Sequence, residues 1–258
     1  MIEEELKRIA LKAVKEGGAI LMEYLGKVQS IDYKGEINLV TEVDRRSEEV
    51  VMGIIKDSYP DHRMLAEETG DSGESSSFKW IIDPLDGTTN YAHGYTCFRI
   101  SLAIEHEGEV IYAAVYDPVR EELFTAEKGK GAYLNGKAIK VSSTQQLNQS
   151  LLCTGFPYDV RNDMNSNILH FRNFLLKTQA VRRDGSAALD LCYTATGRFD
   201  GFWEQKLFPW DVAAGSLLVT EAGGNLSNFK GENFSIYDKE IVASNGIIHN
   251  QMIEVLRR

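Results

Sequence analysis

The sequence predicts an α+β protein in which helices pack between or against two β-sheets. Amphipathic helical patterns occupy the N-terminal region, and a run of strands with hairpin turns follows them. Strands and helices then alternate as far as the C-terminus. No repeat with a fixed period is visible in the 258 residues, so we expect a single layered domain and not a repeat array.

The composition is that of an ordinary globular protein, with 43% hydrophobic and 26% charged residues. The formal net charge of −10 argues against direct nucleic-acid binding and against an anionic membrane surface. Neither a signal peptide nor an apolar run of transmembrane length is present, and we therefore expect a cytoplasmic protein. Cys97, Cys153 and Cys192 are widely spaced and are expected to be reduced core residues.

The first half begins with two amphipathic helices. Apolar residues between Ile2 and Leu25 recur at helical spacing, and a second helix buries residues between Val50 and Ile55. The polar residues 26–41 between them are typical of a loop or a ragged hairpin. Strands are then predicted at 64–66, 80–82, 98–104, 110–116 and 122–126, with a hairpin at 132–136.

The second half alternates between the two kinds of element. The polar run 142–146 is the expected boundary between two subdomains, 1–142 and 143–258, of one domain. Strands are predicted beyond it at 151–156, 180–182, 199–204, 225–227 and 241–243. Helices are predicted at 165–177, 187–196, 210–222 and 247–257.

The most informative segment is 80–90, Trp-Ile-Ile-Asp-Pro-Leu-Asp-Gly-Thr-Thr-Asn. Asp83 and Asp86 follow a buried strand, and regular pairing should stop at Pro84, which has no N–H to donate. Gly87 and Thr88 suit a tight turn and a helix start beside a ligand. Carboxylates bind hard divalent cations, and free backbone N–H groups bind phosphate. An acidic surface turn is the alternative, but the preceding apolar strand favours a binding site.

Two further carboxylates stand at element boundaries. Glu67 ends a predicted strand, and Asp211 follows Pro209-Trp210 at a predicted helix start. Taken singly, a solvated loop acid explains Glu67 and a helix N-cap explains Asp211 at least as well as a functional role does. The five histidines show no metal-ligand spacing.

Segments 66–68 (Ala-Glu-Glu), 80–90 and 210–215 (Trp-Asp-Val-Ala-Ala-Gly) together resemble the three motifs of the inositol monophosphatase family. The resemblance continues at 39–44, 182–188 and 220–224, so it covers nearly the whole chain in the family's order. It implies the αβαβα sandwich shared with fructose-1,6-bisphosphatase, two or three Mg²⁺ ions, and hydrolysis of a phosphate monoester. It also implies a homodimer and sensitivity to lithium.

The resemblance assigns roles to particular residues. The implied metal ligands are the side chains of Glu67, Asp83, Asp86 and Asp211 and the backbone carbonyl of Leu85. Asp44 and Thr88, with Glu67, are implied to orient or deprotonate the attacking water. The implied substrate contacts are Glu67, Leu85, Asp86, Gly87, Thr88, Arg182, Gly185, Ser186, Ala187, Glu204 and Asp211.

Physical chemistry supports such a site independently. Phosphate monoesters hydrolyse extremely slowly without a catalyst, and Mg²⁺ ions neutralise the phosphate and activate water. Four carboxylates carry enough negative charge to hold two or three ions, and neither a Cys-x5-Arg loop nor an obvious nucleophilic Ser–His pair is present. These arguments favour hydrolysis by metal-activated water without a phospho-enzyme, and the family resemblance implies inositol 1-phosphate as the substrate. The alternatives are a fructose-1,6-bisphosphatase, or dual enzyme, and a regulatory binding protein of the transcription machinery.

Overall fold

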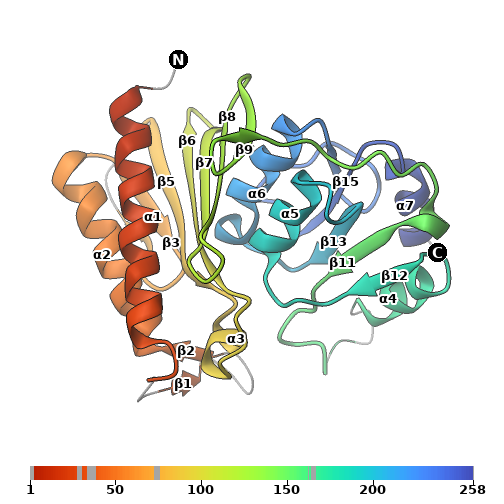
Figure 1. The fold of residues 1–258 in the computed structure, drawn as a ribbon, viewed down its shortest axis with the longest axis horizontal. Coiled ribbons are helices and arrows are strands. Elements are labelled where there is room, and N and C mark those ends of the chain that lie inside the picture. Colours follow the sequence, from red (N-terminus) through yellow and green to blue (C-terminus); the bar gives the residue numbers. More distant parts are fainter. Residues whose placement is uncertain are drawn as a thin grey trace.

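The computed structural model describes residues 3–27, 31–33, 39–72, 76–161, 163 and 167–257. Its elements form five layers in the order helices, sheet, helices, sheet, helices (Figure 1). The predicted layered α+β sandwich is thereby confirmed. The outer layer on one side consists of α1 (Glu4–Tyr24) and α2 (Glu42–Ser58), which pack on each other and on the larger sheet.

The larger sheet has the strand order β10-β9-β8-β7-β6-β5-β3-β4. All neighbouring strands are antiparallel except β3 and β5, which run parallel. Helices cover both faces of this sheet, which explains why the central strand β6 is buried along almost its whole length. Its strands are β3 (Arg63–Ala66), β4 (Gly70–Ser72), β5 (Phe78–Asp86), β6 (Arg99–His106), β7 (Glu109–Asp117), β8 (Glu122–Glu127), β9 (Gly131–Leu134) and β10 (Lys137–Ala138).

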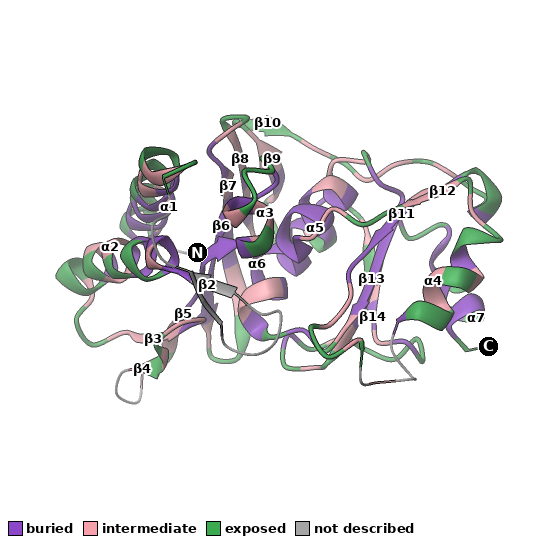
Figure 2. Ribbon diagram, turned by 90° about the horizontal axis from the view of Figure 1, so that it is seen from below, coloured by how far each residue is buried: buried purple, intermediate pink, exposed green. Residues whose placement is uncertain are grey.

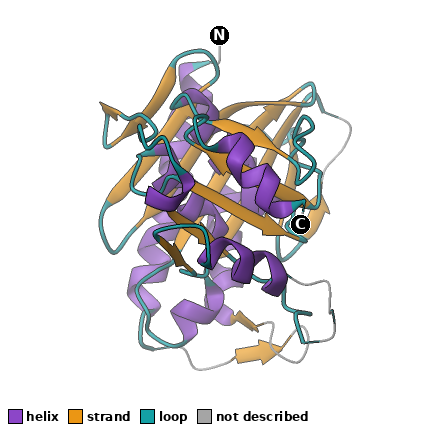
Figure 3. Ribbon diagram, turned by 90° about the vertical axis from the view of Figure 1, so that its right-hand side faces the viewer, coloured by secondary structure: helices purple, strands orange, loops and turns teal. Residues whose placement is uncertain are grey.

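The smaller sheet has the order β12-β11-β13-β15-β14. Between the two sheets lie α5 (Ala187–Ala195) and α6 (Pro209–Glu221), while α4 (Ile168–Leu175) and α7 (His249–Leu256) cover the outer face (Figure 3). Its strands are β11 (Leu151–Thr154), β12 (Ala180–Arg182), β13 (Gly201–Gln205), β14 (Asn225–Ser227) and β15 (Glu240–Ser244). The remaining elements are an antiparallel pair, β1 (Ile31–Tyr33) and β2 (Leu39–Thr41), with α3 (Thr88–Ala92) and the 3₁₀ helix η1 (Leu147–Gln149).

Apolar side chains fill the space between each pair of layers. Trp80 belongs to the cluster under α1 and α2, whereas Trp203 belongs to the cluster under α4 and α7. The middle layer is the most completely buried, and α5 is almost wholly enclosed (Figure 2). Cys97, Cys153 and Cys192 are free and buried, as predicted. No helix within the described ranges is both long enough and apolar enough to cross a membrane.

Strand β5 departs from the prediction at Pro84. Regular pairing is interrupted at Pro84, as predicted, but the strand does not end there, because β5 continues to Asp86 and pairs with β6 again at that residue. Asp83 lies opposite Ser101 and Asp86 opposite Arg99, so β5 has one residue more than β6 over this stretch. The structure accommodates Pro84 in a β-bulge, the position within a sheet where a missing N–H is tolerated.

Candidate active site

The predicted metal ligands line one cavity of about 530 Å³. The cavity lies where the end of β5, the turn after β3 and the starts of α5 and α6 meet. Of the predicted site residues, Asp44 and Arg182 are not in its wall. Those that line it are Glu67, Asp83, Leu85, Asp86, Gly87, Thr88, Gly185, Ser186, Ala187, Glu204 and Asp211.

Asp83 is enclosed by other acids. Its side chain is 1% exposed, and its Oδ1 accepts a hydrogen bond from the backbone N–H of Leu85 at 3.0 Å. Burial raises the pKa of the Asp83 carboxyl well above its usual range, and the charges of Glu67, Asp86 and Asp211 raise it further. Among the described residues, the strongest charges acting on the Asp83 carboxylate are therefore those of other acids.

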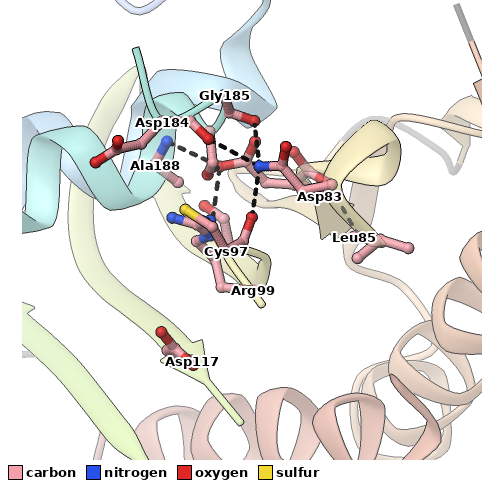
Figure 4. Close-up of polar contacts among 12 residues, drawn as sticks. Asp83, Leu85, Cys97, Arg99, Asp117, Asp184, Gly185 and Ala188 are labelled. Carbon is pink, nitrogen blue, oxygen red and sulfur yellow. Dashed lines mark hydrogen bonds and ion pairs between the residues drawn. The ribbon is translucent and has the colours of Figure 1, made fainter. Parts of the chain in front are cut away.

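Asp86 has protein partners on one oxygen. Its Oδ2 accepts hydrogen bonds from the Ser186 hydroxyl and from the N–H of Ala188 at 2.9 Å, at the start of α5. The same oxygen is 3.7 Å from Nε of Arg99, a fully buried residue that lies beside Cys97 (Figure 4). Burial raises the pKa of Asp86, but Arg99 and the two hydrogen bonds lower it and limit the rise.

Asp211 lies in the first turn of α6. Pro209 occupies the first helical position, where its missing N–H leaves no helical bond unmade, and Phe208 is the N-cap. Asp211 accepts a hydrogen bond from the Phe208 N–H at 2.7 Å, so it closes the helix start without being the N-cap itself. Burial raises the pKa of Asp211 to about 8.

Asp44 and Thr88 form the predicted pair. Asp44 Oδ1 lies 3.0 Å from the Thr88 hydroxyl, which is also 3.1 Å from the Leu85 carbonyl. The other carboxylate oxygen accepts hydrogen bonds from the N–H and the hydroxyl of Thr41, the N-cap of α2. Asp44 therefore stands behind Thr88, and it reaches the cavity only through the threonine hydroxyl.

Gly87 makes the sharp turn into α3 possible. Its φ of +96° lies in the region that favours glycine, and an added Cβ would stand 2.7 Å from the Cys97 carbonyl oxygen. A side chain at residue 87 would displace the turn that carries Thr88 into the cavity.

Two residues of α2 that were not among the predicted site residues contact the segments that carry the predicted ligands. Glu48 accepts hydrogen bonds from the N–H groups of Glu68 and Thr69, at 3.0 and 2.9 Å, and so fixes the turn that begins at Glu67. Ser47 donates to the Pro84 carbonyl at 2.8 Å and supports the bulge. Helical spacing is the signal that could have found them, because both follow Asp44 by three or four residues and share its face.

Glu204 lies near the end of β13 and lines the cavity. Its carboxylate packs on Gly155, where an added Cβ would stand 2.2 Å from Oε1. Burial raises the pKa of Glu204 to about 8, although Arg183 lowers it. Arg183 lines the cavity, whereas the exposed Arg182 donates to its neighbour Val181 and is outside the wall.

Asn90 joins the two halves of the site. Its Nδ2 donates to the carbonyl oxygens of Cys97 and Asp184, each at 2.8 Å. Asp184 and Gly185 precede α5 and lie above Cys97 in the arrangement that Figure 4 shows. Asn90, the last residue of segment 80–90, thus connects the loop before β6 to the segment that carries Gly185, Ser186 and Ala187.

The donor set fits a hard divalent cation. Carboxylates and a backbone carbonyl are the oxygen ligands that Mg²⁺ prefers, and the like charges here raise one another's pKa. In the described part of the chain, no three carboxyl, imidazole or thiol groups already surround a single point. Hydrogen bonds join Asp83 to the backbone of β5, Asp86 to the start of α5 and Asp211 to the start of α6.

Comparisons with known proteins agree with these features. Residues 2–258 match the model of the inositol monophosphatase family. The chain is 46% identical to the inositol-1-monophosphatase of Synechocystis sp. (96% of this chain, 87% of the relative). It is 42% identical to the putative Nus factor SuhB of Neisseria meningitidis (96% of each) and 39% identical to the fructose-1,6-bisphosphatase/inositol-1-monophosphatase of Aquifex aeolicus (99% and 97%).

A solved structure supports the same conclusion. The inositol monophosphatase from Anabaena sp. PCC 7120 superposes with a TM-score of 0.90 at 42% identity, covering 98% of this chain and 96% of that one. Sequence, fold and the convergence of the motif residues on one cavity therefore agree: the chain belongs to the inositol monophosphatase family.

Proposed function

We propose that this protein is a Mg²⁺-dependent phosphatase that hydrolyses inositol 1-phosphate and related sugar phosphates to the free alcohol and phosphate. The observation that carries the proposal is the convergence of Glu67, Asp83, Asp86 and Asp211, from three distant segments, on the cavity that also contains Thr88. The residues that would hold the ions are these four acids and the Leu85 carbonyl. Bound Mg²⁺ would neutralise the phosphate, ease deprotonation of the attacking water and stabilise the leaving alkoxide.

The Asp44–Thr88 pair would orient the attacking water. A hydroxyl has one proton and two lone pairs. When the Thr88 hydroxyl donates its hydrogen bond to Asp44 at 3.0 Å, its lone pairs are left to accept a hydrogen bond from water in the cavity. The Asp44 carboxylate thus fixes the direction of the Thr88 hydroxyl and can take up the proton that the water loses.

The part of the cavity that Glu204 lines would recognise the alcohol. Glu204 is buried, and its carboxyl can accept hydrogen bonds from substrate hydroxyls when ionised or donate one when protonated. Ser186 and Ala187 line the same wall, and Arg183 adds a positive charge near it. A polyhydroxylated ring matches this mixture of donors and acceptors better than an apolar alcohol does.

A steady-state phosphate-release assay tests the proposal, with inositol 1-phosphate and fructose 1,6-bisphosphate as substrates, each with and without Mg²⁺. We expect turnover of inositol 1-phosphate that requires Mg²⁺ and stops on addition of EDTA. Absence of turnover with both substrates at millimolar Mg²⁺ would overturn the assignment.

Two alternatives rest on the names of relatives. The dual name of the Aquifex aeolicus protein favours activity on fructose 1,6-bisphosphate as well, and the same assay measures the ratio of the two activities. The name Nus factor on relatives 42–43% identical favours a regulatory role in transcription complexes. Retention of all four carboxylates favours an enzyme, and a net charge of −10 disfavours direct RNA contact.

A further inference from the structure

Arg99 is a charged residue in the interior that the proposed reaction does not use. Its side chain is 0% exposed, and its Nε lies 3.7 Å from Asp86 Oδ2, an ion-pair distance too long for a hydrogen bond. Among the described residues, the Arg99 guanidinium donates a hydrogen bond only to the Cys97 sulfur, which lies 3.7 Å from Nη2. A guanidinium stays charged in proteins, so this positive charge is permanent.

The β-bulge places Arg99 opposite Asp86. Continuing the register in which Asp83 faces Ser101 would set Phe98 opposite Asp86. The extra residue in β5 shifts the pairing and sets Arg99 there instead. The bulge at Pro84 and Leu85 therefore brings the buried Arg99 opposite the Asp86 carboxylate.

A second buried acid, Asp190, also acts on the charge of Arg99. Asp190 on α5 is 0% exposed, and no described residue donates a hydrogen bond to either of its oxygens. Burial lowers the pKa of the Arg99 guanidinium, and the charges of Asp86 and Asp190 are among those that raise it. A buried guanidinium is tolerated only where such negative charges compensate it.

Asp86 therefore divides its two oxygens between different partners. Ser186, Ala188 and Arg99 all approach Oδ2, which leaves Oδ1 as the oxygen that can bind a cation in the cavity. A cation at Oδ1 would lie on the far side of the same carboxylate from Arg99, and the two positive charges would repel each other.

We propose that the permanent positive charge of Arg99 compensates the Asp86 carboxylate. This keeps the part of the site around Asp86 in place when no metal ion is bound, and it weakens cation binding at Asp86. The inference rests on the proposed function for the identity of the cation as Mg²⁺. It makes Arg99 a positioning residue, because it acts on the site through Asp86 and does not touch the substrate.

Calorimetric titration of the metal-free protein with MgCl₂ tests the inference without any assay of activity. Arg99→Met removes the charge and keeps an unbranched chain, and Arg99→Lys keeps the charge as the matched control. We expect Arg99→Met to bind Mg²⁺ at least about tenfold more tightly than the wild type, whereas Arg99→Lys remains near the wild-type affinity. In EDTA, the Arg99→Met protein should also have a lower melting temperature than the wild type. Addition of Mg²⁺ should raise its melting temperature by more than it raises that of the wild type.

Each outcome decides one question. Unchanged or weaker Mg²⁺ binding by Arg99→Met would overturn the role of Arg99, while a wild-type protein that binds no Mg²⁺ would overturn the proposed function instead. If Arg99→Met fails to fold, the double variant Arg99→Met with Asp190→Asn removes both buried charges, and the same tightening is expected of it. Wild-type affinity in that double variant would contradict the inference.

Discussion

Asp83 and Asp86 are three residues apart on one strand, both are buried, and both line the same cavity, yet their surroundings differ. Asp86 has Arg99, the Ser186 hydroxyl and the Ala188 N–H on one oxygen. Asp83 receives one backbone N–H and is surrounded by the charges of three other acids. Among the described residues, the protein thus places a cation beside Asp86, whereas the charges that act on Asp83 are those of other acids.

Removing Asp83 should therefore have the largest effect on catalysis. We expect Asp83→Asn to lower kcat by about 10³-fold or more at saturating Mg²⁺, because several kcal/mol of transition-state stabilisation depend on the ions it holds. The measurement is phosphate release from inositol 1-phosphate. A variant with near-normal kcat would show that Asp83 is not a ligand.

The same two positions should affect the stability of the metal-free protein with opposite signs. Asp86→Asn leaves Arg99 without its nearest partner and should lower the free energy of unfolding by about 3 kcal/mol. Asp83→Asn removes a carboxylate that its neighbours repel, and it should raise the free energy of unfolding. Urea denaturation in EDTA measures both changes, and changes of the same sign would refute the contrast between the two carboxylates.

The support from α2 should have an intermediate effect. Glu48→Gln loses one of the two carboxylate acceptors that hold the turn after Glu67. We expect the Mg²⁺ concentration for half-maximal activity to rise by about 10-fold or more, as for other residues that orient metal ligands. The neighbouring Glu49→Gln, on the exposed side of the same helix, is the control and should behave as the wild type. Equal behaviour of the two variants would remove Glu48 from the site.

Glu204→Gln should have the smallest effect on the chemical step. Because Glu204 lines the cavity and is proposed to contact the alcohol, we expect KM for inositol 1-phosphate to rise by about tenfold while kcat changes by about threefold or less. The ratio of activities on inositol 1-phosphate and fructose 1,6-bisphosphate should change as well. Loss of activity on every phosphate ester would place Glu204 in the catalytic machinery and not in the alcohol pocket.

Much of this site could be predicted from sequence because its residues stand at element ends. A carboxylate that follows an apolar strand, such as Glu67, or that begins a helix, such as Asp211, is visible in the periodic pattern. The layered fold was predictable for the same reason, since its strands and helices have clear periods. Asp44 required the family resemblance, because the pattern alone does not show that it meets Thr88.

The rest depends on cross-strand register, which a single sequence does not reveal. Pro84 suggested the end of a strand, and only the structure shows a bulge with pairing on both sides. Arg99 appears in the sequence as one charge before an apolar strand, and its contact with Asp86 follows from the register shift. Arg182 and Arg183 are adjacent, and the end of β12 determines which of them lines the cavity.

Locating a cation directly tests the central claim that this cavity is the metal site of a phosphatase. Crystals soaked in MnCl₂, with Mn²⁺ as the probe for Mg²⁺, would show the ion by anomalous scattering. We predict Mn²⁺ in the cavity with the Asp83 carboxylate among its ligands. Mn²⁺ bound only elsewhere on the protein, or bound in the cavity without Asp83, would contradict the account.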